Sequence, residues 1–429
     1  MTVSYLTALL LPPQFPAQRH QLSNGLTVLH QQITTAPVVV VDVWARAGAT
    51  AEPEGWAGMA HFLEHMIFKG SDRLPPGAFD QIIENRGGVT NAATSHDYAH
   101  YFIHTTPSDL AVTLPALAEL LLHAAIPDEE FERERLVVLE ELRQADDDPD
   151  YVAYQALMTS VFPQHAYGRS VLGSHETLMA RSPDQMRQFH RAHYQPENLT
   201  IAIVGDIDCD TALELVDRAF EFAHPQPCPP AKPGLFTLSH SQRQTLHLPR
   251  LEQARLLLSW VGPGAEQLHD AYGLDLLSMV LAGGQSSRLV RQLREEEQLV
   301  LAIGSSFSLQ RHASILTVTA WLDSEHLDLV EARILDRLHD LATTPIDARE
   351  LHRHQRLLRN DYAFSTETAS QIAGLYGYYN TIAQAEISVL YPQVIAAFDP
   401  EMLQSIAAQY LLPERATVTI AQPLETARF

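Results

Sequence analysis

The sequence contains little cysteine. Only Cys209 and Cys228 occur among 429 residues, and they are not in a C-x-x-C arrangement. A dense disulfide framework, typical of small secreted domains, is therefore excluded. Free thiols of a cytosolic protein are favoured over a disulfide between the two.

Positive charge is also scarce, with 29 Lys and Arg against 52 Asp and Glu and a formal net charge of −23. This balance argues against nucleic acid or an anionic membrane surface as a partner and favours basic or extended polypeptides. Apolar runs are short as well: no window reaches the roughly 18 uninterrupted apolar residues of a membrane span.

The first apolar run, Leu6 to Leu11, has no basic segment before it and stops at Pro12 and Pro13. A secretory signal is therefore not expected. We expect a cytoplasmic protein, with a periplasmic location as the alternative if a signal segment has been removed. At 46% hydrophobic and 19% charged residues, the chain is long enough for two or three globular domains.

What the sequence does contain is a pentad with the spacing of a metal site, HFLEH at residues 61–65. On a helix, His61 and His65 lie one above the other and can both bind one metal ion. Glu64 lies beside them, within reach of a water bound to that metal. We expect a helix across AEPEGWAGMAHFLEHMIFKG, with Pro53 in its first turn and Gly70 after its end.

A catalytic zinc commonly has three protein ligands, so one more is needed. The segment PDEEFERERLVVLEELRQ at 127–144 is expected to be a helix, with Pro127 first and acidic residues in its first turn. Glu134 and Glu141 are seven residues apart and share one face of it, whereas Glu140 points about 100° away.

Together these residues resemble the inverted zincins of the pitrilysin and mitochondrial-processing-peptidase family, with the distal glutamate 76 residues after the second histidine. The resemblance implies that His61, His65 and Glu141 bind zinc (Zn2+). It implies that Glu64 is the catalytic base and that Glu134 orients a ligand. The alternative for Glu141 is an ordinary acid on a helix surface.

The remaining elements follow from turn signals and periodicity. Residues 21–47 are expected to form a hairpin, with a turn at Asn24-Gly25 and strands at 26–31 and 38–47. A strand is expected within 87–106. Helices are expected at 79–86, 108–124 and 184–194, and a strand at 199–207.

The plan of the first half repeats, because HRAHYQPENLTIAIVGD at 190–206 is echoed by IAAQYLLPERATVTIAQ at 406–422. In the second copy Leu276, Met279 and Val280 replace the metal motif. We therefore expect a duplicated fold with one emptied site. The domains are 1–222 with zinc, a Pro-rich linker at 223–240, and 241–429 without metal ligands. The resemblance implies the α+β class, each domain a mostly antiparallel sheet with helices on one face, around an enclosed cavity.

The resemblance also implies a substrate-binding edge strand at Asn91, Ala92 and Ala93, where main-chain groups pair with an extended peptide. The alternative is an ordinary strand. Family members usually carry an Arg and, seven residues later, a Tyr that hold the substrate carbonyl. Arg294 matches the arginine, but Leu301 occupies the tyrosine position.

Three explanations of this departure are open: a partner subunit supplies the pair, the enzyme is weak, or Tyr376, Tyr378 or Tyr379 substitutes. The first is favoured, because family members often work as two homologous chains, one with zinc and one with the Arg/Tyr pair. We thus expect a zinc-dependent endopeptidase, in a heterodimer with a zinc-free homologue or in a homo-oligomer. The alternatives are a catalytically idle structural subunit and a zinc-binding module without hydrolysis.

Overall fold

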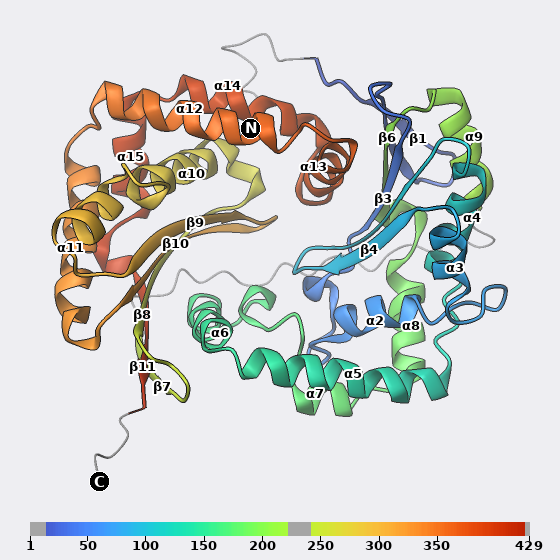
Figure 1. Ribbon diagram of the computed structural model, residues 1–429, viewed down its shortest axis with the longest axis horizontal. Helices are drawn as coiled ribbons and strands as arrows, with labels where there is room; N and C mark the ends of the chain where they lie inside the picture. The colour runs from blue at the N-terminus through green and yellow to red at the C-terminus, as the bar shows by residue number, and fades with distance from the viewer. Residues whose placement is uncertain (1–13, 222–241, 425–429) are drawn as a thin grey trace.

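The computed structural model describes residues 14–221 and 242–424, so the expected linker at 223–240 lies outside the described residues. Each half of the chain builds one sheet with helices against it, and the two halves face each other (Figure 1). The α+β class expected from the sequence is confirmed. No helix among the described residues is both long enough and apolar enough to span a bilayer.

The first sheet has six strands in the order β1-β2-β6-β3-β5-β4, and only the β2–β6 pair is parallel. Strand β4 is therefore at one edge. The strands are β1 Gln18–Gln21, β2 Thr27–Gln32, β3 Val39–Ala45, β4 Val89–Thr94, β5 Ala99–Thr105 and β6 Leu199–Gly205.

The second sheet has five described strands in the order β7-β11-β8-β10-β9, again with one parallel pair, β7–β11. This is the order of the first sheet, with no counterpart of β1 among the described residues. The duplication expected from the sequence is thus confirmed at the level of topology. The strands are β7 Gln242–Leu248, β8 Ala254–Pro263, β9 Ala302–Leu309, β10 Ala313–Leu322 and β11 Thr417–Pro423.

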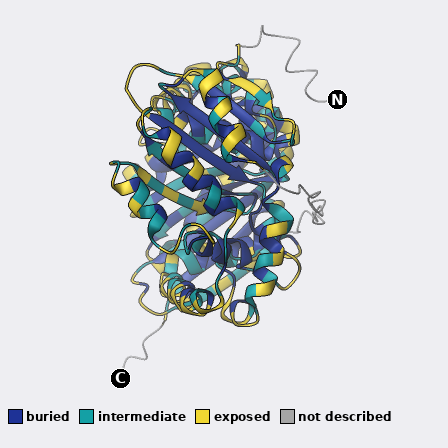
Figure 2. Cartoon of the chain, turned by 90° about the vertical axis from the view of Figure 1, so that its right-hand side faces the viewer, coloured by how far each residue is buried: buried dark blue, intermediate teal, exposed yellow. Residues whose placement is uncertain are grey.

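Most helices of each half bury apolar faces against their own sheet. In β3, alternate residues such as Val39, Val41 and Val43 contribute to the core under these helices. Figure 2 shows the strands buried beneath helices whose outer surfaces are exposed. The helices of the first half are α2 Met59–Ile67, α3 Ala78–Glu84, α4 Leu110–Leu122, α5 Asp128–Asp146, α6 Pro149–Val161, α7 His175–Met179, α8 Pro183–His193 and α9 Cys209–Ala219. Those of the second half are α10 Leu268–Ala282, α11 Leu327–Thr343, α12 Ala348–Phe364, α13 Ala369–Ile382, α14 Tyr391–Ala397 and α15 Pro400–Tyr410.

Two helices cross between the halves. Helix α13 covers the other face of the first sheet, where Ala373 and Tyr376 pack with Val40 and Val204. Helix α6 likewise covers the other face of the second sheet. Each sheet therefore has its own helices on one face and a helix from the other half on the second. The expectation of helices on one face holds only within each half.

Three local expectations were wrong. Strands β2 and β3 do not pair, because β6 lies between them; the Asn24-Gly25 turn instead joins β1 to β2. Residues 87–106 form two strands, β4 and β5, which pair with each other. The metal-motif helix begins at Met59 and not near Pro53, because Gly55 and Gly58 have φ angles of 80° and 90°, which interrupt a right-handed helix.

Candidate metal centre

Helix α2 carries the three residues of the metal motif. His61 and His65 are one turn apart, and their rings lie 4.9 Å apart between centroids. His61 is buried, and its Nδ1 has no hydrogen-bond partner among the described residues. Both histidines thus lie on the same side of α2, as the i, i+4 spacing predicts.

Helix α5 brings a third side chain to the two histidines. Glu141 Oε2 lies 3.7 Å from His61 Nε2 and 3.5 Å from His65 Nε2. One ligand atom of each residue lies within 4.8 Å of the others. The structure therefore brings together the three residues that the sequence assigned as ligands, from two helices that are more than sixty residues apart in the chain.

This donor set fits zinc. Two imidazole nitrogens and one carboxylate oxygen are the ligands of one common class of catalytic zinc site. Ligand atoms about 2.0–2.1 Å from a tetrahedral ion would be about 3.4 Å apart, close to the distances between Glu141 and the two imidazoles. Three protein ligands leave the fourth position of such an ion open.

Glu134 contacts the imidazole of His65. His65 Nδ1 lies 2.9 Å from Glu134 Oε1, so a neutral imidazole that donates this proton presents the lone pair of Nε2 toward Glu141 and the metal position. The other carboxylate oxygen, Oε2, forms an ion pair of 2.6 Å with Lys69 Nζ. Glu134 therefore contacts both Lys69 and His65, and it is the residue expected from the resemblance to orient a ligand.

Glu64 lies on the same helix turn and faces strand β4. Its Oε2 accepts a hydrogen bond of 2.5 Å from the hydroxyl of Thr94. Burial raises the pKa of Glu64 above its ordinary value, and the Thr94 hydrogen bond acts in the opposite direction. A carboxylate with a raised pKa is better suited to accept and return a proton.

The electrostatics of His61 favour a neutral ligand. Burial, together with the neighbouring His65, lowers the pKa of His61 to about 4. The imidazole therefore keeps its lone pair at neutral pH, which metal binding requires.

Strand β4 supplies the expected edge. It pairs with β5 on one side and has no strand on its other side among the described residues. Asn91 and Ala93 are exposed, whereas Ala92 packs toward the core. An edge strand of this kind offers main-chain donors and acceptors to an extended peptide.

Arg294 is not part of the metal group. It lies on the π-helix Val290–Glu296 in the second half, and its guanidinium pairs with the adjacent Glu295 at 2.6 Å. Leu301, at the position of the family tyrosine, is 55% exposed.

The three candidate tyrosines of the second half have other partners. The hydroxyl of Tyr376 donates to Gln31 at 2.6 Å, and that of Tyr378 donates to the carbonyl of Leu309 at 2.5 Å. Tyr379 shares a hydrogen bond with Tyr272. The structure therefore does not favour these tyrosines as substitutes.

Three contacts in this geometry were not predicted from the sequence. Thr94 and Lys69 contact Glu64 and Glu134, and Glu52 accepts a hydrogen bond of 2.9 Å from the N–H of Ala60 at the start of α2. Alternation within 89–94 places Thr94 on the side of the strand that faces the helices, but it does not reveal its partner.

Comparison with known families gives two matches. Residues 27–175 match the family described as "Insulinase (Peptidase family M16)". Residues 181–358 match the family described as "Peptidase M16 inactive domain". The first range contains the whole candidate metal centre, and the second contains Arg294.

Similar proteins and structures agree with these matches. The zinc protease PqqE of Helicobacter pylori is 28% identical over 421 residues, covering 94% of this chain and 92% of that protein. A zinc protease of Mycobacterium tuberculosis is 30% identical over 356 residues, covering 82% and 81% of the two chains. The crystal structure of a protease from Helicobacter pylori superimposes with a TM-score of 0.89 at 26% identity, covering 96% of this chain and 100% of that one.

Proposed function

The chain belongs to the M16 family of peptidases, the pitrilysin and insulinase group, and on this premise we propose that it is a zinc-dependent endopeptidase acting on peptides or unfolded polypeptide segments. The observation that carries the proposal is the convergence of His61, His65 and Glu141, with Glu64 beside them. A zinc-binding module without hydrolysis would have no use for Glu64.

The chain's own residues have separate roles in the proposed reaction. His61, His65 and Glu141 would hold the zinc ion, which when bound supplies Lewis acidity and makes water a stronger acid. Glu64 accepts a proton from the attacking water and returns it to the leaving amine. Glu134 keeps His65 in the tautomer that presents Nε2.

Strand β4 would hold the substrate. An extended peptide aligned on its free edge would pair with the main chain of Asn91, Ala92 and Ala93. Because Thr94 is the last residue of this strand and binds Glu64, the peptide would be held next to the catalytic base. Recognition through main-chain groups gives affinity with little dependence on substrate sequence.

We further propose that this chain is the zinc-bearing subunit of a pair. Arg294 has a carboxylate partner in Glu295, and the exposed Leu301 cannot donate a hydrogen bond. An oxyanion donor can contribute roughly 100-fold or more to the rate. A zinc-free homologous partner that carries the Arg/Tyr pair would supply this donor.

The second candidate is a catalytically idle structural subunit of the same family. The loss of the tyrosine at Leu301 favours it, as does the match of the second half to the model described as an inactive domain. The retained metal group argues against it, because an idle subunit has no need of three converging ligands and a base.

The two candidates are separated by metal analysis and peptide cleavage on four forms: the wild type, H61A, E141A and E64Q. We expect about one zinc per wild-type or E64Q chain, with little in H61A and E141A. Cleavage of an unstructured peptide should be slow for the wild-type chain, rise when the homologous partner is added, and be absent for E64Q with the partner.

Two results would count against the proposal. Wild-type chain without zinc would favour the idle subunit, and an E64Q variant that cleaves at the wild-type rate would remove Glu64 from the mechanism. Full activity of the purified chain alone would refute the partner requirement while leaving the peptidase assignment intact.

A further inference from the structure

Two hairpins at equivalent places in the two sheets meet at their turns. Residues 95–98 join β4 to β5, and residues 310–312 join β9 to β10; in each sheet the first strand of the hairpin lies at the edge. The two turns approach each other near the middle of Figure 1. The turn after the candidate substrate strand therefore lies against the half of the chain that does not carry the metal motif.

A buried carboxylate, that of Asp97, forms the contact between the two turns. Its Oδ2 accepts a hydrogen bond of 3.0 Å from the main-chain N–H of Arg311, in the β9–β10 turn. Only 8% of Asp97 is exposed. A carboxylate is costly to bury unless donors surround it, so these donors restrict where the β4–β5 turn can lie.

The hydroxyl of Tyr167 joins the same contact from a third segment, the short helix Ala166–Gly168 after α6. It donates to Asp97, at 2.9 Å from Oδ1 and 3.1 Å from Oδ2, and it accepts from the N–H of His312 at 3.2 Å. Burial, together with the carboxylate of Asp97, raises the pKa of Tyr167. The phenol therefore keeps its proton and remains a donor to Asp97.

The β4–β5 turn is tight, so a contact made at the turn also restrains the edge strand. The N–H of Ser95 donates to the carbonyl of Tyr98 at 2.8 Å, which closes the turn directly after β4. Asp97 is three residues after Thr94, whose hydroxyl donates to Glu64. A displaced turn would therefore displace both the strand expected to bind the peptide and the donor to the candidate base.

The turn is also held from within its own half. The N–H groups of Ala49 and Thr50 donate to the carbonyls of Ser95 and His96, at 3.1 and 2.8 Å. These bonds connect the turn to the segment before α2, whereas Asp97 connects it to the second half. Loss of the Asp97 contact should therefore shift or loosen the turn without unfolding the hairpin.

We propose that Asp97 is a positioning residue for the peptidase reaction, an inference that rests on the function proposed above. Through Tyr167 and the β9–β10 turn, its carboxylate ties the β4–β5 hairpin to the second half, and so sets the place of the substrate edge and of Thr94 relative to α2. The second half thus contributes to catalysis by holding the strand that would bind the substrate. A displacement of about 1 Å near the reacting groups can lower a rate by about 100-fold.

The test is peptide cleavage by the full chain, with the homologous partner present, in two variants. D97N replaces one accepting oxygen by an amino group that cannot accept, and Y167F removes the hydroxyl but keeps the ring. Each should lower kcat by about tenfold or more while zinc content stays at the wild-type level. Y167F tests the contact even if D97N does not fold.

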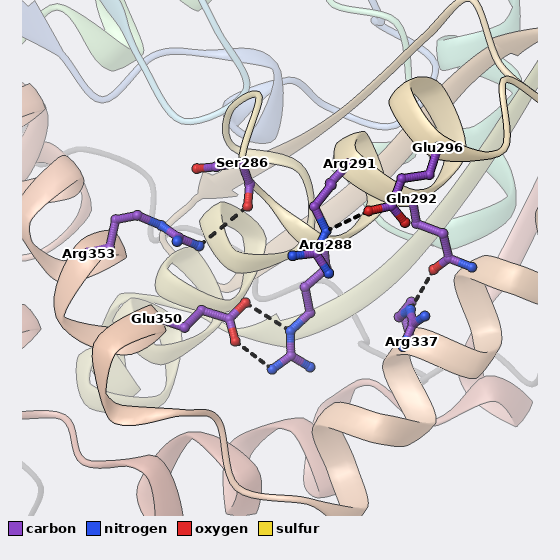
Figure 3. A pocket seen from close by; sticks show the side chains of 8 residues that line it. All are labelled: Ser286, Arg288, Arg291, Gln292, Glu296, Arg337, Glu350 and Arg353. Atoms are coloured by element: carbon purple, nitrogen blue, oxygen red, sulfur yellow. Dashed lines mark hydrogen bonds and ion pairs between the residues drawn. The ribbon is translucent and has the colours of Figure 1, made fainter.

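Two control variants change similar contacts away from the edge strand. Glu350 forms a bidentate pair with Arg288 in the second half, at 3.0 and 2.8 Å, so E350Q is the control for D97N (Figure 3). The hydroxyl of Tyr410 donates to Asp270 at 2.9 Å, so Y410F is the control for Y167F. Both controls should cleave at the wild-type rate.

A double-mutant cycle distinguishes positioning from a general weakening of the fold. If Asp97 acts through Thr94, D97N should lower kcat by a smaller factor in the T94V background than in the wild type. Hydrogen exchange at the amides of β4 provides a measurement that needs no turnover. It should be faster in D97N and Y167F than in the wild type and the two controls.

The outcomes separate this proposal from the proposed function. A wild-type chain that cleaves no peptide, even with its partner, would overturn the proposed function. Wild-type cleavage by D97N and Y167F would overturn only the role of Asp97, and so would exchange in β4 that matches the wild type in both variants. An equal factor for D97N in the two backgrounds would show that Asp97 does not act through Thr94, and would overturn the positioning role.

Discussion

The hydroxyl of Thr94 donates a hydrogen bond of 2.5 Å to Oε2 of Glu64, and so joins the edge strand β4 to the candidate catalytic base on α2. The bond fixes one oxygen of the carboxylate and leaves Oε1 without this partner. The edge strand and the candidate base are thereby held in a fixed position relative to each other. No sequence motif predicts this hydrogen bond between Thr94 and Glu64.

The Thr94–Glu64 bond predicts the effect of removing the hydroxyl. In T94V the carboxylate of Glu64 loses a donor and one constraint on its rotamer, so kcat should fall by roughly tenfold or more while KM changes little. T94S keeps the hydroxyl and should retain most of the rate. Steady-state kinetics with the partner chain present measure both. Equal rates for T94V and T94S would show that the bond has no role in positioning.

The contact of Glu134 with His65 predicts a loss of metal affinity in E134Q. The amide removes the negative charge that supports the imidazole and leaves Lys69 without its partner. Zinc affinity should fall by about 10- to 100-fold. Competition with a chromophoric chelator measures it, and E140Q, on the exposed face of the same helix, is the control expected to bind as the wild type. Unchanged affinity in E134Q would contradict the orienting role.

Leu301 predicts a gain of function. If the missing hydroxyl limits the isolated chain, L301Y should raise its peptide cleavage by about 10-fold or more, since one oxyanion donor can contribute about 100-fold. L301F adds a ring of similar size without the hydroxyl and should give no gain. Cleavage assays without the partner distinguish them. Equal rates for the two variants would place the deficit elsewhere.

A buried histidine predicts acid sensitivity of the fold. His190 Nε2 lies 2.7 Å from the carbonyl of Leu121, and burial lowers the pKa of His190 to about 4. In the unfolded chain the pKa returns to about 6.5, so the unfolded state binds more protons between these values. The stabilisation is present above pH 6.5 and is lost as the pH falls toward 4.

The measurement is urea unfolding at pH 7.5 and 5, with a chelator present so that metal release does not contribute. One such group should remove on the order of 2 kcal/mol between these two pH values. H190Q should show a correspondingly smaller pH dependence than the wild type, and H175Q, at an exposed position, the same dependence as the wild type. An identical pH dependence in H190Q would exclude His190 as a contributor.

Two glycines of α13 predict opposite effects of alanine. A Cβ at Gly377 would lie 2.1 Å from Nε1 of the buried Trp44, so G377A must displace α13 from the first sheet and should destabilise the protein by about 1–3 kcal/mol. Gly374, on the same helix, has nothing within 4 Å, and G374A should stabilise by up to about 1 kcal/mol. Thermal unfolding compares them. Stabilisation by both would show that Trp44 can move aside.

Local patterns predicted the site better than they predicted the sheet. The spacing of His61, Glu64 and His65 on one helix and of Glu134 and Glu141 on another is a property of helical periodicity, and the structure brings these side chains together. Their roles stay a proposal. Family membership and the duplicated α+β fold, which the motifs indicated, are confirmed.

Contacts between distant segments could not be predicted. The insertion of β6 between β2 and β3 depends on a strand some 160 residues later in the chain, and nothing in residues 21–47 specifies it. Helix signals at Pro53 predict too early a start for α2, because they do not specify the positive φ that Gly55 and Gly58 adopt. The partner of Thr94, Glu64, likewise comes from an element brought close only by the tertiary fold.

Because α6 packs on the second sheet and α13 on the first, the two halves do not need a covalent connection to stay together. Each half contributes to the hydrophobic core of the other, through Leu157 and Met158 on one side and Ala373 and Tyr376 on the other. If the polypeptide were cut between residues 221 and 242, the two fragments would remain associated through α6 and α13. The cut protein should migrate as one species in gel filtration. Each fragment made separately should have one face of its sheet uncovered, because the helix that covers this face belongs to the other fragment.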